Sequence, residues 1–133
     1  MKTYEQYREY RKPSWAPPAW LFGPVWTVLY ILIAISFCYV GYLWIIGRIP
    51  MQVALPFILN LVFNFLFTTI QFKWRNFKAA FIDIIFVLGT LIWAMISIWP
   101  IEQWVVYINI PYVIWVSFAT VLQFSVTRMN SQV

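Results

Sequence analysis

Four long apolar stretches, separated by very short breaks, constrain the fold of this chain most. They cover residues 20–46, 51–72, 77–99 and 104–127, and each is long enough to supply the roughly 20 residues that cross a hydrocarbon core. None shows the apolar/polar alternation of membrane β-strands. Because backbone polar groups inside a bilayer must be satisfied internally, we expect an all-α membrane protein, an antiparallel bundle of four transmembrane helices.

The composition agrees with lipid as the solvent and excludes several chemistries. Of the residues, 63% are hydrophobic and only 10% are charged, whereas soluble domains average about 25% charged residues. The chain has no His, and its single cysteine, Cys38, allows neither an intrachain disulfide nor a Cys cluster for a metal. The cations flank apolar runs instead of forming a patch, which argues against nucleic acid as a partner.

The distribution of Lys and Arg predicts the orientation in the membrane. Eight of the nine cations lie in the N-terminal arm, around the second break or at the end of the last stretch, and Arg48 alone lies on the other side. The positive-inside rule therefore places both termini in the cytoplasm. We expect a cytoplasmic arm over residues 1–19, a single bundle over residues 20–133, and a location in the cell membrane.

Polar side chains follow one face of the second stretch. Asn60, Asn64, Thr68 and Gln71 are spaced 4, 4 and 3 residues apart, which places them on the same side of a helix. They could hydrogen-bond between helices or form the polar wall of a binding cavity. Both interpretations stay open at this point.

Three tryptophans, Trp26, Trp93 and Trp115, lie well inside their stretches. Their rings could pack between helices or form a flat apolar slot for a planar ligand. Gly23 lies on the same helical face as Trp26 and leaves room for another helix or a ligand. Other residues at helical spacing lie on the same faces as Trp26 and Trp115. They are Gly23 and Tyr30 in the first stretch, and Phe118, Ala119 and Leu122 in the last.

The segment before the first stretch is rich in proline and tryptophan. Because a proline disfavours helical geometry in the residue before it, residues 13–18 are expected to be extended and stiff. They are either an entry turn or a lid over a cavity. The lid residues would be Trp15, Pro17, Pro18 and Trp20.

Three motifs in order resemble the TspO/MBR family, the tryptophan-rich sensory proteins that include the mitochondrial translocator protein. The first is Pro13-Ser14-Trp15-Ala16-Pro17-Pro18-Ala19-Trp20, continuing through Gly23-Pro24-Val25-Trp26 to Leu29-Tyr30. The second is Asn64 with Arg75 and Asp83, and the third is Pro111-Tyr112 with Trp115 and Phe118-Ala119-Thr120-Val121-Leu122. The family fold has five helices, and the chain begins where the second should start. We therefore expect the first helix to be missing and a homodimer to cover the exposed surface.

The resemblance implies a cavity that binds porphyrins and other hydrophobic ligands, roofed by the Trp-Pro-Pro segment. Carried over by position, the pocket residues are Trp26, Gly23, Asn64, Trp115, Phe118 and Ala119, to which the helical faces add Tyr30 and Leu122. Arg75 could meet a ligand carboxylate, or pair with Asp83 as Lys78 also could. A sterol is the weaker candidate, because Phe124 stands where the cholesterol-recognition pattern needs Tyr.

Four functions fit these features. A binding protein or sensor that needs no cofactor comes first, with metal-free protoporphyrin as the ligand, because few residues could serve as axial iron ligands. A light- or oxygen-dependent porphyrin-degrading enzyme is an alternative, although nothing resembles an acid–base pair or an activated nucleophile. A small transporter would need a carboxylate at mid-membrane for proton coupling, and Asp83 lies too near the end of its stretch. A purely structural membrane subunit would bind no ligand.

Overall fold

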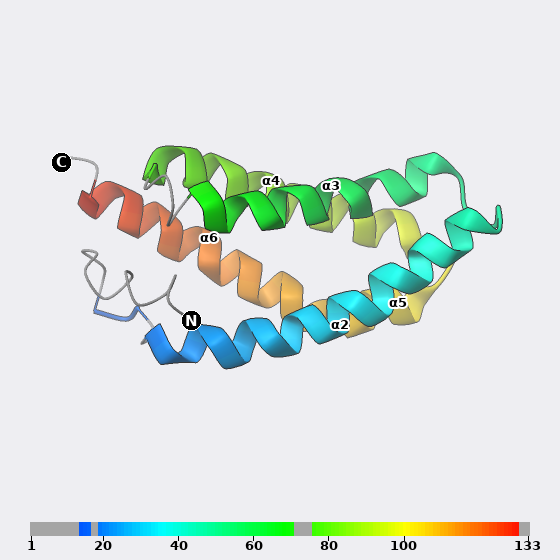
Figure 1. The fold of residues 1–133 in the computed structure, drawn as a ribbon, viewed down its shortest axis with the longest axis horizontal. Helices are drawn as coiled ribbons and strands as arrows, with labels where there is room; N and C mark the ends of the chain where they lie inside the picture. The colour runs from blue at the N-terminus through cyan, green and yellow to red at the C-terminus, as the bar shows by residue number, and fades with distance from the viewer. Residues whose placement is uncertain (1–13, 17–18, 71–75, 131–133) are drawn as a thin grey trace.

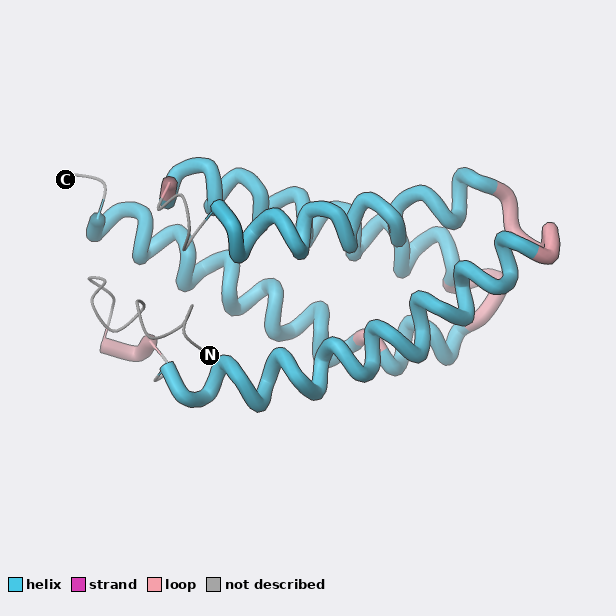
Figure 2. The backbone as a smooth tube through the Cα atoms, in the orientation of Figure 1, coloured by secondary structure: helices cyan, strands magenta, loops and turns pink. Residues whose placement is uncertain are grey.

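The computed structural model describes residues 14–16, 19–70 and 76–130, and all regular secondary structure in these ranges is helical. The helices are α2 (Ala19–Ile45), α3 (Met51–Thr68), α4 (Phe77–Ile98), α5 (Gln103–Ile108) and α6 (Ile110–Asn130). They run along the length of the molecule (Figures 1 and 2). The α2–α3 and α4–α5 turns lie at one end of it, and the break between α5 and α6 lies partway along it. The predicted all-α bundle is confirmed.

Three of these helices are long and apolar enough to cross a membrane: Trp20–Ile45 in α2, Phe77–Ile98 in α4 and Ile110–Met129 in α6. The apolar part of α3, Met51–Phe67, is shorter. With 18 residues and a rise of about 1.5 Å per residue, α3 is about 27 Å long, close to the roughly 30 Å of a hydrocarbon core. Residues 71 and 72 of the predicted second stretch lie outside the described residues.

The turn between α2 and α3 depends on one glycine. Gly47 has φ +77°, a left-handed conformation that costs glycine little because it has no Cβ. The amide of Gly47 donates to the Trp44 carbonyl at 3.0 Å, and that of Arg48 donates to the Leu43 carbonyl at 2.8 Å. This pair of bonds is a Schellman motif, which satisfies the last carbonyls of α2 and reverses the chain.

The expectation of one continuous helix over residues 104–127 is wrong, because Asn109 separates α5 from α6. Pro111 lacks the amide hydrogen that a continuous helix would use, and its ring would clash with the carbonyl of Tyr107. The buried Asn109 side chain compensates, since its Nδ2 donates to the Val105 carbonyl at 2.8 Å and to Ser36 Oγ at 2.9 Å. Proline therefore breaks the helix, and an amide side chain satisfies a carbonyl beside the break.

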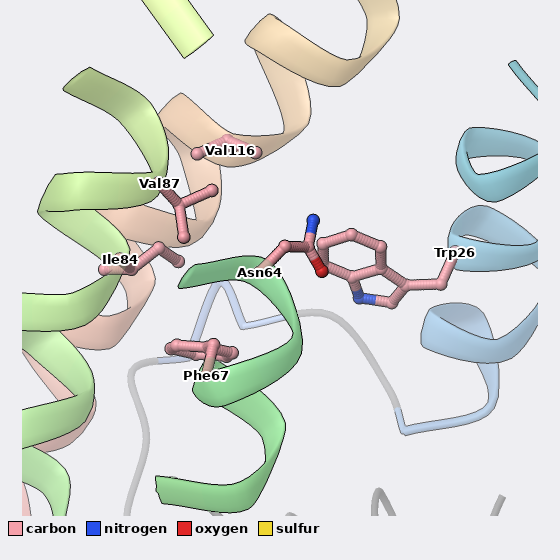
Figure 3. Close-up of a pocket in the computed structure, with 6 residues that line it drawn as sticks. All are labelled: Trp26, Asn64, Phe67, Ile84, Val87 and Val116. Atoms are coloured by element: carbon pink, nitrogen blue, oxygen red, sulfur yellow. The ribbon is translucent and has the colours of Figure 1, made fainter. Parts of the chain in front are cut away.

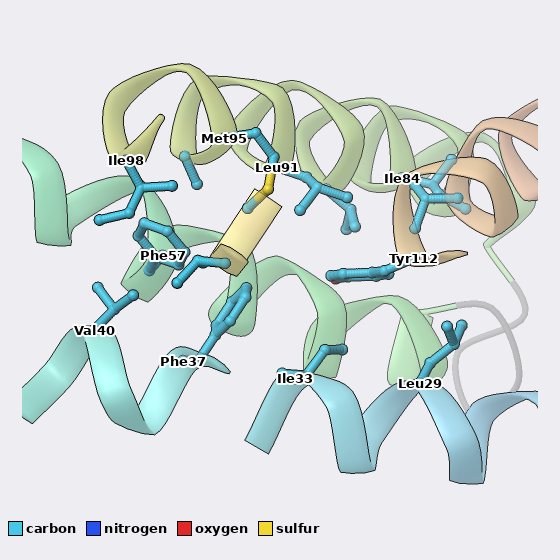
Figure 4. Close-up of a cluster of buried hydrophobic side chains, with 14 of the residues drawn as sticks. Leu29, Ile33, Phe37, Val40, Phe57, Ile84, Leu91, Met95, Ile98 and Tyr112 are labelled. Atoms are coloured by element: carbon cyan, nitrogen blue, oxygen red, sulfur yellow. The ribbon is translucent and has the colours of Figure 1, made fainter. Parts of the chain in front are cut away.

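The buried core explains where the bundle is open. The pairs α3–α4 and α4–α6 make the most extensive helix contacts, while α2 packs against α3 and the short α5. Figure 4 shows side chains of α2, including Phe37 and Val40, facing Phe57 of α3 and Ile98 of α4. Figure 1 shows α2 close to α3 near the Gly47 turn and separated from α3 and α6 at the end where α2 begins. The candidate site lies at this end of the bundle, between α2 and α6.

Candidate ligand-binding site

Five aromatic side chains gather where α2 faces α6, and we call them the aromatic cluster: Phe22, Trp26, Tyr30, Trp115 and Phe118. The ring centroid of Trp115 lies 5.7 Å from that of Phe22, 6.4 Å from that of Trp26 and 5.6 Å from that of Phe118. Trp26 also stacks on Tyr30, with centroids 5.4 Å apart. Trp115 is the centre of the cluster, and its buried indole Nε1 has no hydrogen-bond partner among the described residues.

The segment before α2 reaches the edge of this cluster. The ring of Trp15 lies 5.8 Å from that of Phe118, in an edge-on geometry, and Ala16 packs against the core. Trp20, by contrast, is 67% exposed on the first turn of α2. Pro17 and Pro18 lie outside the described residues, so the role of the segment as a lid stays a prediction.

A chain of hydrogen bonds connects the cluster to the centre of the bundle. Tyr30 Oη donates to Asn64 Oδ1 at 3.2 Å, and Asn64 Nδ2 donates to Tyr112 Oη at 2.6 Å. Tyr112 Oη donates in turn to Asn60 Oδ1 at 2.9 Å, and Asn60 Nδ2 donates to the Val87 carbonyl at 2.9 Å. These bonds join α2, α3, α6 and α4, so the two asparagines hold the helices together, as one of the two open interpretations expected. The side chains of Thr68 and Gln71 lie outside the described part.

The other interpretation, the polar wall of a binding cavity, stays a prediction, although Asn64 borders a small space inside the bundle. A small space lies between α2, α3, α4 and α6, and Figure 3 shows Trp26 and Asn64 pointing toward each other across it. Its lining residues are Trp26, Asn64, Phe67, Ile84, Val87 and Val116. We call this space the interior cavity. Its volume is about 10 Å³, and a single water molecule needs about 10–15 Å³.

A much larger space lies on the outer side of the cluster, between α2 and α6, and we call it the α2–α6 groove. Its volume is about 850 Å³. The lining residues are Leu21, Pro24, Val25, Val28, Leu29, Pro111, Ile114, Trp115 and Phe118. Ligand pockets usually measure about 300–1,000 Å³, so the groove has the size of a site for a small organic molecule.

The remaining predicted pocket residues lie elsewhere. A Cβ added to Gly23 would meet nothing within 4 Å, so no other helix among the described residues packs closely against Gly23. The alternative that Gly23 leaves room for a ligand stays a prediction. Ala119 and Leu122 pack into the hydrophobic core and line neither the interior cavity nor the groove. Trp93 is 42% exposed on the outer side of α4, so the slot interpretation is wrong for it.

Asp83 is buried on α4, and its Oδ2 has no hydrogen-bond partner. Within the described ranges no ion pair joins Asp83 to Lys78, which is exposed. Arg75, the other expected partner and a candidate for a ligand carboxylate, lies outside these ranges. Asp83 precedes Ile84, a residue of the interior cavity, but does not itself line that space.

The sequence reasoning did not single out the central role of Tyr112 or the participation of Phe22. Tyr112 is fully buried and bonds both asparagines of α3. It lies three residues before Trp115, so the helical spacing that selected Phe118 and Ala119 also includes Tyr112. Phe22 lies four residues before Trp26 and could have been found by the same rule.

Comparison with known proteins agrees with this architecture. The model of the TspO/MBR family matches residues 1–129. The chain belongs to the TspO/MBR family. It is 35% identical over 129 residues to the tryptophan-rich protein TspO of Bacillus cereus, covering 93% of this chain and 80% of the relative. It is 32% identical over 120 residues to the tryptophan-rich protein TspO of Chlorobaculum tepidum, covering 90% and 75%. With the human translocator protein it shares 33% identity over 134 residues, covering 93% and 74%. With its long apolar helices, this TspO/MBR family member is an integral membrane protein.

Proposed function

We propose that this TspO/MBR family protein binds a flat, hydrophobic, porphyrin-like molecule at the aromatic cluster. The observation that carries the proposal is the environment of Trp115. Its ring contacts Phe22, Trp26 and Phe118, while its indole N–H has no acceptor in the part of the chain that the structure describes. Aromatic faces suit a planar macrocycle, and the unpartnered N–H could donate to a ligand oxygen.

The cluster favours a ligand without a tightly held metal. Tyr30 is the only member of the cluster with an oxygen that could ligate iron, and its hydroxyl is already bonded to Asn64. A metal-free tetrapyrrole such as protoporphyrin IX therefore fits the cluster better than haem. Binding of this kind requires no cofactor, and it is compatible with sensing or with transport of the ligand.

A titration with protoporphyrin IX tests the proposal. The native protein should show saturable quenching of tryptophan fluorescence at micromolar ligand. The double variant Trp26→Leu, Trp115→Leu should bind at least tenfold more weakly, which corresponds to about 1.4 kcal/mol. The matched control is Trp93→Leu, Trp99→Leu, because these rings are 42% and 41% exposed and lie outside the cluster. Its affinity should stay within twofold of the native value.

Two results would refute the binding function. One is quenching of the native protein that rises without saturation. The other is equal affinity in the native protein and in the Trp26→Leu, Trp115→Leu variant.

We infer that the protein resides in the cell membrane with both termini in the cytoplasm. Lys78 lies in the first turn of α4 and Arg128 in the last turn of α6, both at the end where α2 begins. Arg48 follows α2 at the opposite end. The positive-inside rule orients this arrangement. We also propose a homodimer, because α3 exposes an apolar surface that includes Val62 and Phe65. A single-chain mass by light scattering at all concentrations would exclude the dimer.

A further inference from the structure

We propose that the ligand occupies the α2–α6 groove, on the side of the bundle that faces lipid, and not the interior cavity beside Asn64. This inference rests on the binding function proposed above and assigns its location. The ligand class is a molecule dissolved in the bilayer, flat and apolar over most of its surface, with polar substituents confined to one edge.

The available volumes separate the two locations. The interior cavity measures about 10 Å³ and the groove about 850 Å³. Trp26, Phe67 and Val116 contribute to the wall of the interior cavity, and Trp26 is itself 9% exposed. A macrocycle could enter this cavity only if several of these buried side chains moved. The groove needs no such rearrangement.

The chemistry of the groove defines its occupant. All nine lining residues are apolar or aromatic, so no charged group of the described residues meets the ligand there. Burying a charge against such a surface without a partner is strongly unfavourable. Because α2 and α6 both contain membrane spans, the groove opens toward acyl chains. An uncharged face of the ligand therefore fits the groove, and the ligand reaches it from the bilayer.

The groove is continuous with the aromatic cluster and has a defined direction. Trp115 and Phe118 belong to both. Along α2 the groove runs from Leu21 to Leu29, a rise of about 12 Å. Its Leu21 end lies near the start of α2, and Trp15 packs there against Phe118. Tryptophan is typical of the membrane–water interface, so the polar edge of the ligand points toward this end.

Four single substitutions test the location because they separate filling the groove from adding a large ring to a lipid-facing helix. Val28 and Ile114 line the groove and are 55% and 63% exposed. Val28→Trp and Ile114→Trp should fill it. The matched controls are Ile31→Trp on α2 and Val121→Trp on α6, whose native side chains are 54% and 58% exposed but do not line the groove.

Each variant is reconstituted in phosphatidylcholine nanodiscs and titrated with protoporphyrin IX, whose own emission reports binding. Val28→Trp and Ile114→Trp should weaken affinity at least tenfold, while Ile31→Trp and Val121→Trp stay within twofold of the native value. Thermal unfolding followed by circular dichroism should give the same midpoint for all four variants, because every substituted side chain is exposed. A loss of affinity at an unchanged midpoint supports occupation of the groove.

Three outcomes overturn the inference. If the groove variants bind like the native protein while Trp26→Leu, Trp115→Leu does not, the ligand lies in the interior; the groove proposal fails and the proposed function stands. If the native protein itself shows no saturable binding, the proposed function fails and the groove proposal with it. If Val28→Trp or Ile114→Trp keeps its affinity but changes the mass from two chains to one, the groove is an interface between copies.

Discussion

Replacing Tyr112 by Phe removes one hydroxyl from the centre of the hydrogen-bond chain and leaves the ring in place. Tyr112 is fully buried, and its hydroxyl accepts from Asn64 Nδ2 at 2.6 Å and donates to Asn60 Oδ1 at 2.9 Å. Both bonds are lost in Tyr112→Phe. Since phenylalanine retains the ring, the substitution creates almost no cavity. The change in the free energy of unfolding therefore comes mainly from the two lost hydrogen bonds.

The expected magnitude follows from these two bonds. Hydrogen bonds between membrane helices contribute about 0.6 kcal/mol each on average and at most about 1.7 kcal/mol. Two such bonds give a loss of about 1–3 kcal/mol in the free energy of unfolding. Asn60 keeps its bond to the Val87 carbonyl and Asn64 keeps its bond from Tyr30. These remaining bonds use the other atom of each amide, so Asn64 Nδ2 and Asn60 Oδ1 both lose their partner. The loss should therefore lie at the upper end of this range, because an unsatisfied buried polar group is costly.

Unfolding by SDS in mixed micelles measures this free energy. The matched control is Tyr107→Phe, because Tyr107 is 59% exposed and its variant should differ from the native protein by less than about 0.5 kcal/mol. A double-mutant cycle with Asn64→Leu should give a coupling of about 0.6–1.7 kcal/mol. If Tyr112→Phe unfolds with the native free energy, or if the coupling is zero, the chain of bonds does not stabilise the bundle.

Two further sets of substitutions test local features, the turn after α2 and the start of α4. Gly47→Ala should lower the free energy of unfolding by about 1–2 kcal/mol, because alanine is strained at φ +77°. Gly41→Ala lies inside α2, where an added Cβ meets nothing within 4 Å, and should raise the free energy of unfolding by up to about 1 kcal/mol. Both variants are measured by the same SDS titration. If both free energies change in the same direction, the backbone argument for Gly47 is wrong. Asn76→Ala should cost about 1 kcal/mol, because Asn76 Oδ1 accepts from the Ala79 amide at 3.1 Å at the start of α4. Asn76→Ser keeps such an acceptor, and equal thermal midpoints for the Ala and Ser variants would show that the cap contributes nothing.

Much of the fold could be predicted because a bilayer imposes a length and a polarity on every spanning segment. The first and third predicted stretches, residues 20–46 and 77–99, agree with α2 and α4 to within about one residue. The last stretch was predicted as one helix because hydropathy does not register a proline within an apolar run. Pro111 was nevertheless present in the sequence as a signal for the break at Asn109.

The candidate site could be predicted only in part. The 3.6-residue period correctly placed Asn60 and Asn64 on one buried face, and it brought Trp26 and Trp115 under consideration. The same signal also selected Trp93, which faces outward, because a tryptophan in the middle of a span looks identical in sequence on either side of a helix. Arg75 and the Pro17-Pro18 pair lie outside the described residues, and their roles stay predictions.

The sequence by itself determined that this protein lies in a lipid bilayer. It also determined the number of long apolar segments and the face of α3 on which Asn60 and Asn64 lie. These depend on composition and on the helix period, both of which are local. The tertiary structure alone decided that Tyr112 meets both asparagines, that the interior cavity is nearly closed and that a wide groove lies outside it. Those features depend on how far α2 separates from α6, which is set by the packing of α2 against α3 and α5 at the opposite end of the bundle. No residue in the chain encodes that separation singly, because it is the sum of many contacts between helices that are distant in sequence.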